Sequence, residues 1–343
     1  MIKITKPKDR DFIETVEGYL FCIVGYIHPP DGYTAYLKYV PSKDGKWERE
    51  GIRYSRSIPY YQVSQVENTY NWLKKTHPEY ILQCPVRGIE ISWVPRNRVK
   101  KYYDPRDRLE EIKKKNAKDP LEERLVKLAS LLEERAGIEG SVGVTGSILT
   151  RTHNPEFSDL DITVYGANES YKVKKVVMDL KEEAREITGI SNQEKNKWVQ
   201  NRLSKHGLDK EELMKIADRR WNYGYIDGVY FSVHPTRTDN EITENYGDNT
   251  YNRIGEITGT ATVSDNMESI YLPAVYKLTE CKPNRDISEI VSFEGLYGSL
   301  FEKGDKIEFN GILEEIKGES PRHRVIVGGA GSPDSYIKWG YSG

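Results

Sequence analysis

The stretch from Gly146 to Ile162, GSILTRTHNPEFSDLDI, constrains the fold of this chain more than any other. Its Gly-Ser pair is followed, after eleven residues, by two aspartates at positions i and i+2, Asp159 and Asp161. On a strand, residues i and i+2 point to the same face, so these carboxylates project side by side. Two carboxylates that close repel each other and resist ionisation unless a cation joins them. The pattern therefore predicts a strand that holds a cation.

A helix and a short strand are expected directly before this stretch. Asp119 is a candidate N-cap, Pro120 suits the first helical position, and Glu122 sits where the acid of a capping box reaches back. An apolar stripe at helical spacing then continues to Gly137. The stripe consists of Leu121, Leu125, Leu128 and Leu132. The next residues, SVGVTG, are typical of a buried strand that ends at a glycine.

The predicted cation site is of the kind that handles phosphates. Mg²⁺, or Mn²⁺ in its place, prefers carboxylate oxygens and keeps part of its shell for water and substrate phosphates. Gly146 and Ser147 offer backbone N–H groups and a hydroxyl to the same phosphates. Asp159 and Asp161 are therefore the candidate catalytic and metal-binding residues for in-line displacement at a nucleotide phosphorus. Arg151 is a further nucleotide-binding candidate, with an ordinary loop-surface position as its alternative.

These residues resemble the signature of the DNA polymerase β-like nucleotidyltransferase superfamily. That signature is an apolar residue, Gly, Gly or Ser, a short connection, then Asp, any residue, and Asp or Glu. The resemblance covers about residues 119–236, and the whole chain is similar to uncharacterised archaeal proteins described as predicted nucleotidyltransferases. It implies a mixed sheet with helices, a divalent metal, and an NTP as substrate.

Catalytic members of the superfamily usually bring a third carboxylate from a later strand. The candidate strand here is VYFSVHP, where Ser232 holds the inward position and His234 follows. Asp227 lies upstream, but the glycine after it favours a hairpin turn. His234 is either a general base or a hydrogen-bonded strand histidine. Ser232, Asp227 and His234 are thus the candidates for the third position, and the strand itself supplies no acid.

We expect an α+β multidomain protein with three parts. Residues 1–105 form a small α+β domain of unknown role, and residues 106–240 form the nucleotidyltransferase-like domain with its central mixed sheet. Residues 241–343 carry short strands with regular turns, which predict an OB-like β-barrel. Tyr297 and Phe301 are expected on the surface of this barrel. Such barrels either bind single-stranded nucleic acid by stacking on aromatics or serve as plain interaction modules.

Local signals add detail to the two flanking parts. A hairpin is expected at the PPDG turn that begins at Pro29, followed by a helix that ends near His77. Residues 96–118 hold ten Lys or Arg against four Asp or Glu. We interpret this segment as a solvated linker, with a phosphate-contacting strip as the alternative.

Composition excludes several other classes of protein. The formal net charge of −2 excludes a uniformly basic surface, so any contact with nucleic acid is local. Cys22, Cys84 and Cys281 lie far apart without a CxxC pair, which favours small buried side chains over a disulfide framework or a zinc site. No run of eighteen apolar residues and no signal-peptide core is present. We expect a cytoplasmic protein without membrane contact.

The sequence therefore predicts metal-dependent nucleotidyl transfer from an NTP to an acceptor hydroxyl. An RNA or DNA end is the expected acceptor, because a basic segment and an OB-like module suit a polymer. The absent third acid supports an alternative, a non-catalytic nucleotide- or RNA-binding protein with a degenerate site. A further alternative is the modification of a protein or a small molecule.

Overall fold

The computed structural model describes residues 6–57, 63–203, 207–283, 286–328 and 334–340. The chain divides into two compact units. Unit 1 consists of Met1–Leu82, Glu90–Gly189 and Trp221–Glu244. Unit 2 consists of Gln83–Ile89, Ile190–Arg220 and Asn245–Gly343. Short 3₁₀ helices occur at η1 (Pro78–Tyr80), η2 (Arg96–Arg98), η3 (Asp239–Glu241), η4 (Met267–Ile270) and η5 (Gly295–Tyr297).

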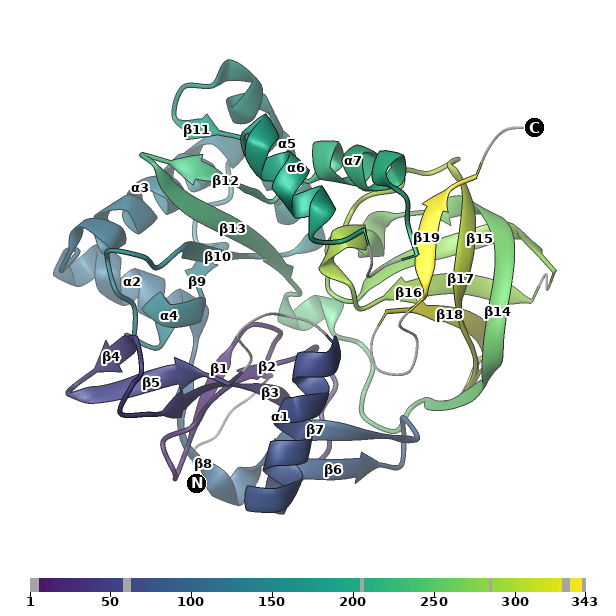
Figure 1. Ribbon diagram of the computed structural model, residues 1–343, viewed down its shortest axis with the longest axis horizontal. Helices are drawn as coiled ribbons and strands as arrows, with labels where there is room; N and C mark the ends of the chain where they lie inside the picture. Colours follow the sequence, from purple (N-terminus) through teal and green to yellow (C-terminus); the bar gives the residue numbers. More distant parts are fainter. Residues whose placement is uncertain (1–5, 58–62, 204–206, 284–285, 329–333, 341–343) are drawn as a thin grey trace. The chain divides into compact units, whose positions relative to one another are not determined.

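The amino-terminal part of the chain is built on an antiparallel sheet, drawn in purple and blue in Figure 1. Its strands are β1 (Phe12–Thr15), β2 (Leu20–Ile23), β3 (Gly32–Pro41), β4 (Trp47–Arg49), β5 (Ile52–Arg56), β6 (Ile81–Cys84), β7 (Ile89–Pro95) and β8 (Val99–Tyr103). The main path runs β4-β5-β3-β2-β1-β8. Helix α1 (Val63–Thr76) packs Leu73 on one face of this sheet. The predicted hairpin between β2 and β3 and the helix that ends before Pro78 are confirmed.

A second sheet of unit 1 carries the opening stretch of the sequence. It consists of β9 (Val142–Val144), β10 (Leu160–Tyr165), β11 (Ile187–Thr188), β12 (Tyr223–Ile226) and β13 (Val229–Thr236). The strand order is β11-β12-β13-β10-β9, and β10 and β13 run parallel while the other pairs are antiparallel. Helices α3 (Pro120–Ala136) and α5 (Ala167–Glu183) pack against this sheet. The predicted mixed sheet with helices is confirmed.

Helix α3 begins and ends where its sequence predicts. The Asp119 carboxylate accepts the N–H groups of Leu121 and Glu122, and Gly137 ends the helix in the left-handed conformation. All four stripe leucines are buried. The predicted capping box is wrong, because the Glu122 carboxylate instead accepts from the Lys118 N–H and from the guanidinium of Arg108 in the neighbouring helix.

The basic segment at residues 96–118 is not a linker. It forms η2, strand β8, which pairs with β1, and helix α2 (Pro105–Lys115). Leu109 and Ile112 of α2 are buried, and Lys113 pairs with Glu133 of α3 at 2.7 Å. The linker interpretation failed because lysines and arginines at the outward positions of an amphipathic helix mask its short apolar stripe.

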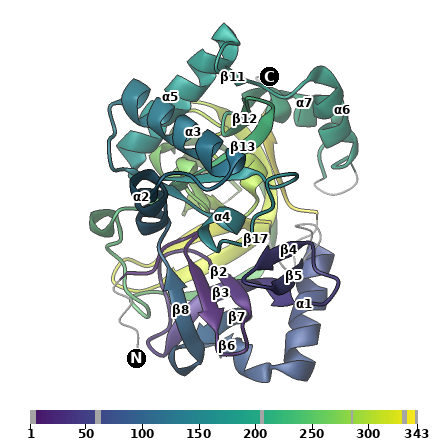
Figure 2. The same ribbon diagram turned by 90° about the vertical axis from the view of Figure 1, so that its left-hand side faces the viewer.

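Helix α4 (Gly146–Leu149) follows β9 and carries the Gly-Ser pair. Figures 1 and 2 both show α4 beside the amino-terminal sheet. The contact is apolar: Leu149 lies in a buried cluster with Tyr39 and Tyr54 of that sheet. Helix α4 therefore packs on the face of the amino-terminal sheet opposite α1.

Unit 2 contains a closed five-stranded barrel. Its strands are β14 (Thr250–Asp265), β15 (Ala274–Lys282), β16 (Ile287–Ser292), β17 (Lys306–Lys317) and β18 (Arg322–Val327), with β19 (Tyr336–Trp339) added to β17. The first strand pairs with the second and the fourth, and the third runs parallel to the fifth. Helices α6 (Asn192–Gln200) and α7 (Lys210–Arg219) share the barrel's apolar core. The sequence patterns missed β15, β19 and α6.

The two aromatics expected on the barrel surface are buried. Tyr297 and Phe301 have no exposed surface. The Tyr297 hydroxyl accepts the N–H of Ile337 at 3.1 Å, and Phe301 packs on Trp339 with ring centroids 4.8 Å apart. Both residues occur in a loop-rich stretch without strand periodicity, so their position in the sequence did not reveal that the loop folds into the core.

The cysteines behave as the sequence predicts, since all three are free and buried. None of the helices described in the structure combines the length and the apolar character that crossing a bilayer requires.

Candidate functional site

The two aspartates lie at the beginning of β10. Asp159 directly precedes the strand and Asp161 is its second residue. The neighbouring parallel strand, β13, places Ser232 opposite Asp161 and His234 opposite Thr163. The pairing of these two strands therefore brings two of the three sequence candidates for the third position next to Asp161.

A chain of hydrogen bonds joins these strands. The Ser232 hydroxyl donates to Oδ1 of Asp161, and Nε2 of His234 lies 2.7 Å from the same hydroxyl oxygen. Since Ser232 has a single proton to give, the ring N–H of His234 donates to Ser232. Nε2 of His234 also lies 3.6 Å from Oδ1 of Asp161. One oxygen of Asp161 is thus fixed by β13.

The other oxygen of Asp161 explains the glycine of the Gly-Ser pair. A Cβ on Gly146 would overlap Oδ2 of Asp161 and would lie 3.2 Å from its Cγ. Gly146 also has a φ of 67°, in the left-handed region that glycine adopts without strain. The glycine is therefore required both by the backbone turn and by the carboxylate that fills the place of its missing side chain.

The pKa values of the two carboxyl groups are shifted in opposite directions. Burial and then the charge of Asp161 raise the pKa of Asp159, Arg56 and Lys38 oppose them, and the balance of these effects brings the pKa to about 6. Burial also acts to raise the pKa of Asp161, but hydrogen bonds and charge from His234, followed by Ser232 and Lys38, hold this pKa well below its usual value. Asp161 therefore favours the ionised form, and its negative charge opposes the ionisation of Asp159.

The remaining predicted residues lie in different places. Ser147 is buried beside Gly146 in α4. Arg151 points to α2, where its guanidinium forms an ion pair with Glu111. Asp227 sits in the turn of the β12–β13 hairpin with a φ of 46° and pairs with Lys127 at 2.7 Å. The structure thus brings Gly146 to Asp161, with Ser147 as the next residue of α4, whereas Asp227 belongs to the hairpin turn.

Cations from the amino-terminal part of the chain act on the charges of this site. Lys38 of β3 and Arg56 of β5 act on the pKa of Asp159, and Arg10, before β1, lowers the pKa of His234 together with burial. Sequence reasoning missed these three residues because they follow no motif. The one available signal was a lysine within a strand, β3, whose other residues are mostly apolar or aromatic.

The side chains in this site suit a divalent cation. Among the residues that the structure describes, the side-chain hydrogen bond to Asp161 ends on Oδ1, so Oδ2, against Gly146, keeps its lone pairs. Asp159 adds a second carboxylate, whose ionisation is opposed by the charge of Asp161. A bound cation that prefers oxygen ligands would favour the ionised form of both groups. Asp159 and Asp161 are the residues that would hold the metal.

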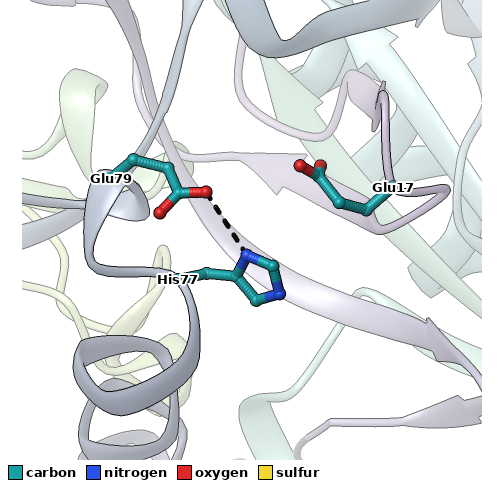
Figure 3. A group of neighbouring side chains, drawn as sticks. All are labelled: Glu17, His77 and Glu79. Atoms are coloured by element: carbon teal, nitrogen blue, oxygen red, sulfur yellow. Dashed lines mark hydrogen bonds and ion pairs between the residues drawn. The ribbon is translucent and has the colours of Figure 1, made fainter.

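In two other clusters of acids and histidines, the acids already have ion-pair or hydrogen-bond partners within the protein. The first is formed by Glu17, His77 and Glu79, shown in Figure 3. Nδ1 of His77 lies 3.3 Å from Glu79, and its Nε2 lies 3.0 Å from the Tyr19 hydroxyl. Arg98 forms ion pairs with both Glu17 and Glu79. A guanidinium therefore already forms ion pairs with both acids of this cluster.

The second cluster consists of Asp119, Glu122 and His153. The Asp119 carboxylate caps α3, and its Oδ2 lies 2.9 Å from Nε2 of His153. The Glu122 carboxylate accepts hydrogen bonds from the Arg108 guanidinium and from the Lys118 N–H. These contacts give each carboxylate a structural task at the start of α3.

Strands β9, β10 and β13 and helix α4 thus place a Gly-Ser pair beside an Asp-x-Asp strand, as the nucleotidyltransferase signature in the sequence predicts. Residues 125–242 match the family model of the nucleotidyltransferase domain. The chain is also 32% identical, over 328 residues, to an uncharacterised protein of Methanocaldococcus jannaschii, and the match covers 94% of this chain and 96% of the relative. The chain belongs to the polymerase β-like nucleotidyltransferases. No solved structure matches it.

Proposed function

We propose that this protein transfers a nucleoside monophosphate from an NTP to an acceptor hydroxyl, with Mg²⁺ or Mn²⁺ held by Asp159 and Asp161. The observation that carries the proposal is the placement of the Asp161 carboxylate in the space left by Gly146. This contact joins the two halves of the family motif, which are separated by eleven residues in the sequence.

The residues of the site have distinct tasks in this proposal. When bound, the divalent cation supplies positive charge to the phosphates and to the attacking oxygen. Ser232 fixes Oδ1 of Asp161, which orients Oδ2 toward the substrate side. Gly146 and Ser147 bind the phosphates, since glycine permits close approach of the backbone.

The reaction balances without a further co-reactant. The acceptor oxygen attacks the α-phosphorus and forms a new P–O bond, while the bond from the α-phosphorus to the oxygen that bridges to the β-phosphate breaks. Pyrophosphate leaves with that electron pair, and the proton of the acceptor hydroxyl passes to water. Positioning and charge stabilisation are what the protein contributes to such a transfer.

We further propose that the acceptor is the end of a nucleic acid and that the barrel of unit 2 is OB-like. The strand order supports this, because the first strand pairs with the second and fourth, and the third and fifth are parallel. OB-folds are five-stranded barrels that bind oligonucleotides on one face and through their loops. In this proposal the chain has three functional parts, residues 1–105, 106–240 and 241–343.

The test is transfer from each α-labelled NTP, with Mg²⁺ or Mn²⁺, to RNA and DNA oligonucleotides with free 3′ hydroxyls. We expect metal-dependent labelling that is lost in Asp161→Asn and kept in Asp227→Asn, which removes a carboxylate outside the site. If neither nucleic acid, protein nor small molecules in a cell extract are labelled, transfer is excluded as the function.

One observation favours a second candidate, a non-catalytic nucleotide- or RNA-binding protein. Ser232 occupies the position opposite Asp161 where catalytic relatives carry an acid. Calorimetry separates the two: NTP or RNA binding that survives Asp161→Asn, without turnover, favours the binding protein. Metal-dependent binding that this change abolishes favours the enzyme. Labelling of a protein or small molecule in the extract would identify the acceptor as one of these instead.

A further inference from the structure

One face of the amino-terminal sheet lies against the candidate site. Leu149 of α4 packs into a layer of side chains on this face: Phe12, Leu20, Cys22, Tyr39, Tyr54 and Tyr103. Since α4 begins with Gly146 and Ser147, the layer around Leu149 lies next to the Gly-Ser pair.

Two cations project from this same layer. Lys38 lies two residues after Tyr36 on β3, and Tyr36 packs against the Leu149 layer. Arg56 lies two residues after Tyr54 on β5, and Tyr54 belongs to the layer. Because strand residues alternate between faces, both cations point to the side of the sheet that meets α4.

Lys38 owes part of its position to a β-bulge. Consecutive residues of β2 pair with Leu37 and Tyr39, which leaves Lys38 as the extra residue between them. Bulges re-aim side chains and are frequent beside active sites. Lys38 is half-buried, and its Nζ lies 3.4 Å from the hydroxyl oxygen of Tyr36 on the same face.

Hydrogen bonds hold the sheet on the segments that flank α4. The Thr145 hydroxyl, one residue before Gly146, donates to the carbonyl of Arg10 at 2.6 Å. The N–H of Glu48 on β4 donates to the carbonyl of Thr152 at 3.3 Å. The sheet is therefore anchored on both sides of the Gly-Ser pair, and its cations keep their place relative to the aspartates.

Electrostatic effects agree with this placement. Burial lowers the pKa of Lys38 to about 8, and the charge of Asp161 opposes this lowering. Arg56 and Lys38 both act to lower the pKa of Asp159. The charges of the two cations thus act on the same aspartates that would hold the metal.

We propose that Lys38 and Arg56 bind the triphosphate of the incoming nucleotide and hold the β- and γ-phosphates that leave as pyrophosphate. The proposal rests on the proposed function for the identity of the nucleotide, and it gives the amino-terminal domain a role in the site.

Charge balance explains why the site needs these residues. One divalent cation neutralises the two aspartates, while a triphosphate brings further negative charge. Gly146 and Ser147 offer an N–H and a hydroxyl but no charge, and Arg151 is paired with Glu111. A guanidinium binds two phosphate oxygens at once, and an ammonium binds them as a point charge.

The test measures binding of inorganic tripolyphosphate to the full chain by calorimetry, with Mg²⁺ present. We expect Lys38→Gln and Arg56→Gln each to weaken this binding by about tenfold or more, because each removes charge-assisted hydrogen bonds. Lys43→Gln and Arg53→Gln are matched controls, since Lys43 lies in the loop after β3 and Arg53 pairs with Glu48 on the exposed side of β5. Both controls should retain wild-type affinity.

Two further variants separate phosphate binding from simple neutralisation of the acids. Lys38→Arg and Arg56→Lys keep the charge and should restore part of the affinity. If Lys38→Gln and Arg56→Gln bind tripolyphosphate like the wild type, and instead bind Mn²⁺ more tightly, the cations serve only to neutralise Asp159 and Asp161 and the proposal is overturned. Arg56 is exposed, so its variant tests the proposal even if a change at Lys38 prevents folding.

Failure of this proposal differs from failure of the proposed function. A wild-type protein that transfers nucleotides, with variants that keep its KM and its inhibition by pyrophosphate, overturns the role of Lys38 and Arg56 alone. A wild-type protein that binds tripolyphosphate through these two residues but transfers nothing overturns the transfer alone.

Discussion

Gly146 and Asp161 are matched to each other: the carboxylate of Asp161 occupies the space where a side chain on Gly146 would lie. The contact couples the turn after β9 to the strand that carries both aspartates. A change at Gly146 therefore acts on the metal site through Asp161.

Gly146→Ala is the first test of this coupling. The left-handed φ costs an alanine about 1 to 2 kcal/mol, and the methyl group also displaces the Asp161 carboxylate. We expect reduced stability in urea together with loss of Mn²⁺ binding measured by electron paramagnetic resonance. Gly137→Ala is the matched control, because Gly137 has a φ of 62° and no atom near its missing Cβ. The control should lose similar backbone stability and keep Mn²⁺ binding, and equal Mn²⁺ affinities in both variants would contradict the coupling.

Ser232→Asp tests whether the position opposite Asp161 is a vacant place for a third metal ligand. A third carboxylate should tighten Mn²⁺ binding by roughly tenfold, because ligand charge sets the affinity of such sites. Without metal, the added repulsion against Asp161 should lower the unfolding temperature. Ser232→Asn has a similar size without the charge and should show neither effect. Unchanged Mn²⁺ affinity in Ser232→Asp would exclude this position as a ligand site.

Glu111 should contribute to stability in a pH-dependent way. Burial acts to raise its pKa, but hydrogen bonds from Lys115, Arg151 and Arg108 lower it from 4.5 to about 2. An acid with a lowered pKa stabilises the fold above its unfolded pKa, and that contribution disappears as the pH falls from 4.5 toward 2. The difference in urea midpoint between the wild type and Glu111→Gln should therefore be larger at pH 6 than near pH 2.

The control for this titration is Glu110→Gln. Glu110 lies next to Glu111 in α2, but it is exposed and pairs only weakly, at 3.6 Å, with Lys114. Its variant should show a small and nearly constant difference from the wild type over the same range of pH. A pH-independent effect of Glu111→Gln would show that Arg151 and Arg108 gain nothing from the charge of Glu111.

The local part of the site could be read from the sequence. Asp159, Asp161 and Gly146 lie within one short stretch, and strand alternation and the glycine turn dictate their arrangement. Helix α3 was equally accessible, because its cap, its leucine stripe and its terminal glycine are all local signals. The pairing of Ser232 with Asp161 followed from the inward position of a neighbouring strand.

The contribution of the amino-terminal sheet could not be read in this way. Lys38 and Arg56 precede Asp159 by about a hundred residues or more, and they reach the site only because Leu149 packs on one face of their sheet. Such docking depends on the shape and apolarity of a whole face, and neither cation carries a spacing or a motif that reports it. The basic segment at residues 96–118 was misread for a related reason, since charge density hid its buried residues.

The buried aromatics of the barrel lead to the last prediction. Tyr297→Phe removes the acceptor for the Ile337 N–H and should lower the free energy of unfolding by about 1 kcal/mol, while RNA binding stays unchanged. Phe293 is the contrasting residue, because 45% of its surface is exposed. If the barrel binds single-stranded RNA by stacking, Phe293→Ala should weaken binding in fluorescence anisotropy by about fivefold or more with little change in stability. Weaker RNA binding in Tyr297→Phe, at temperatures where the variant is fully folded, would contradict the assignment of Tyr297 to the core alone.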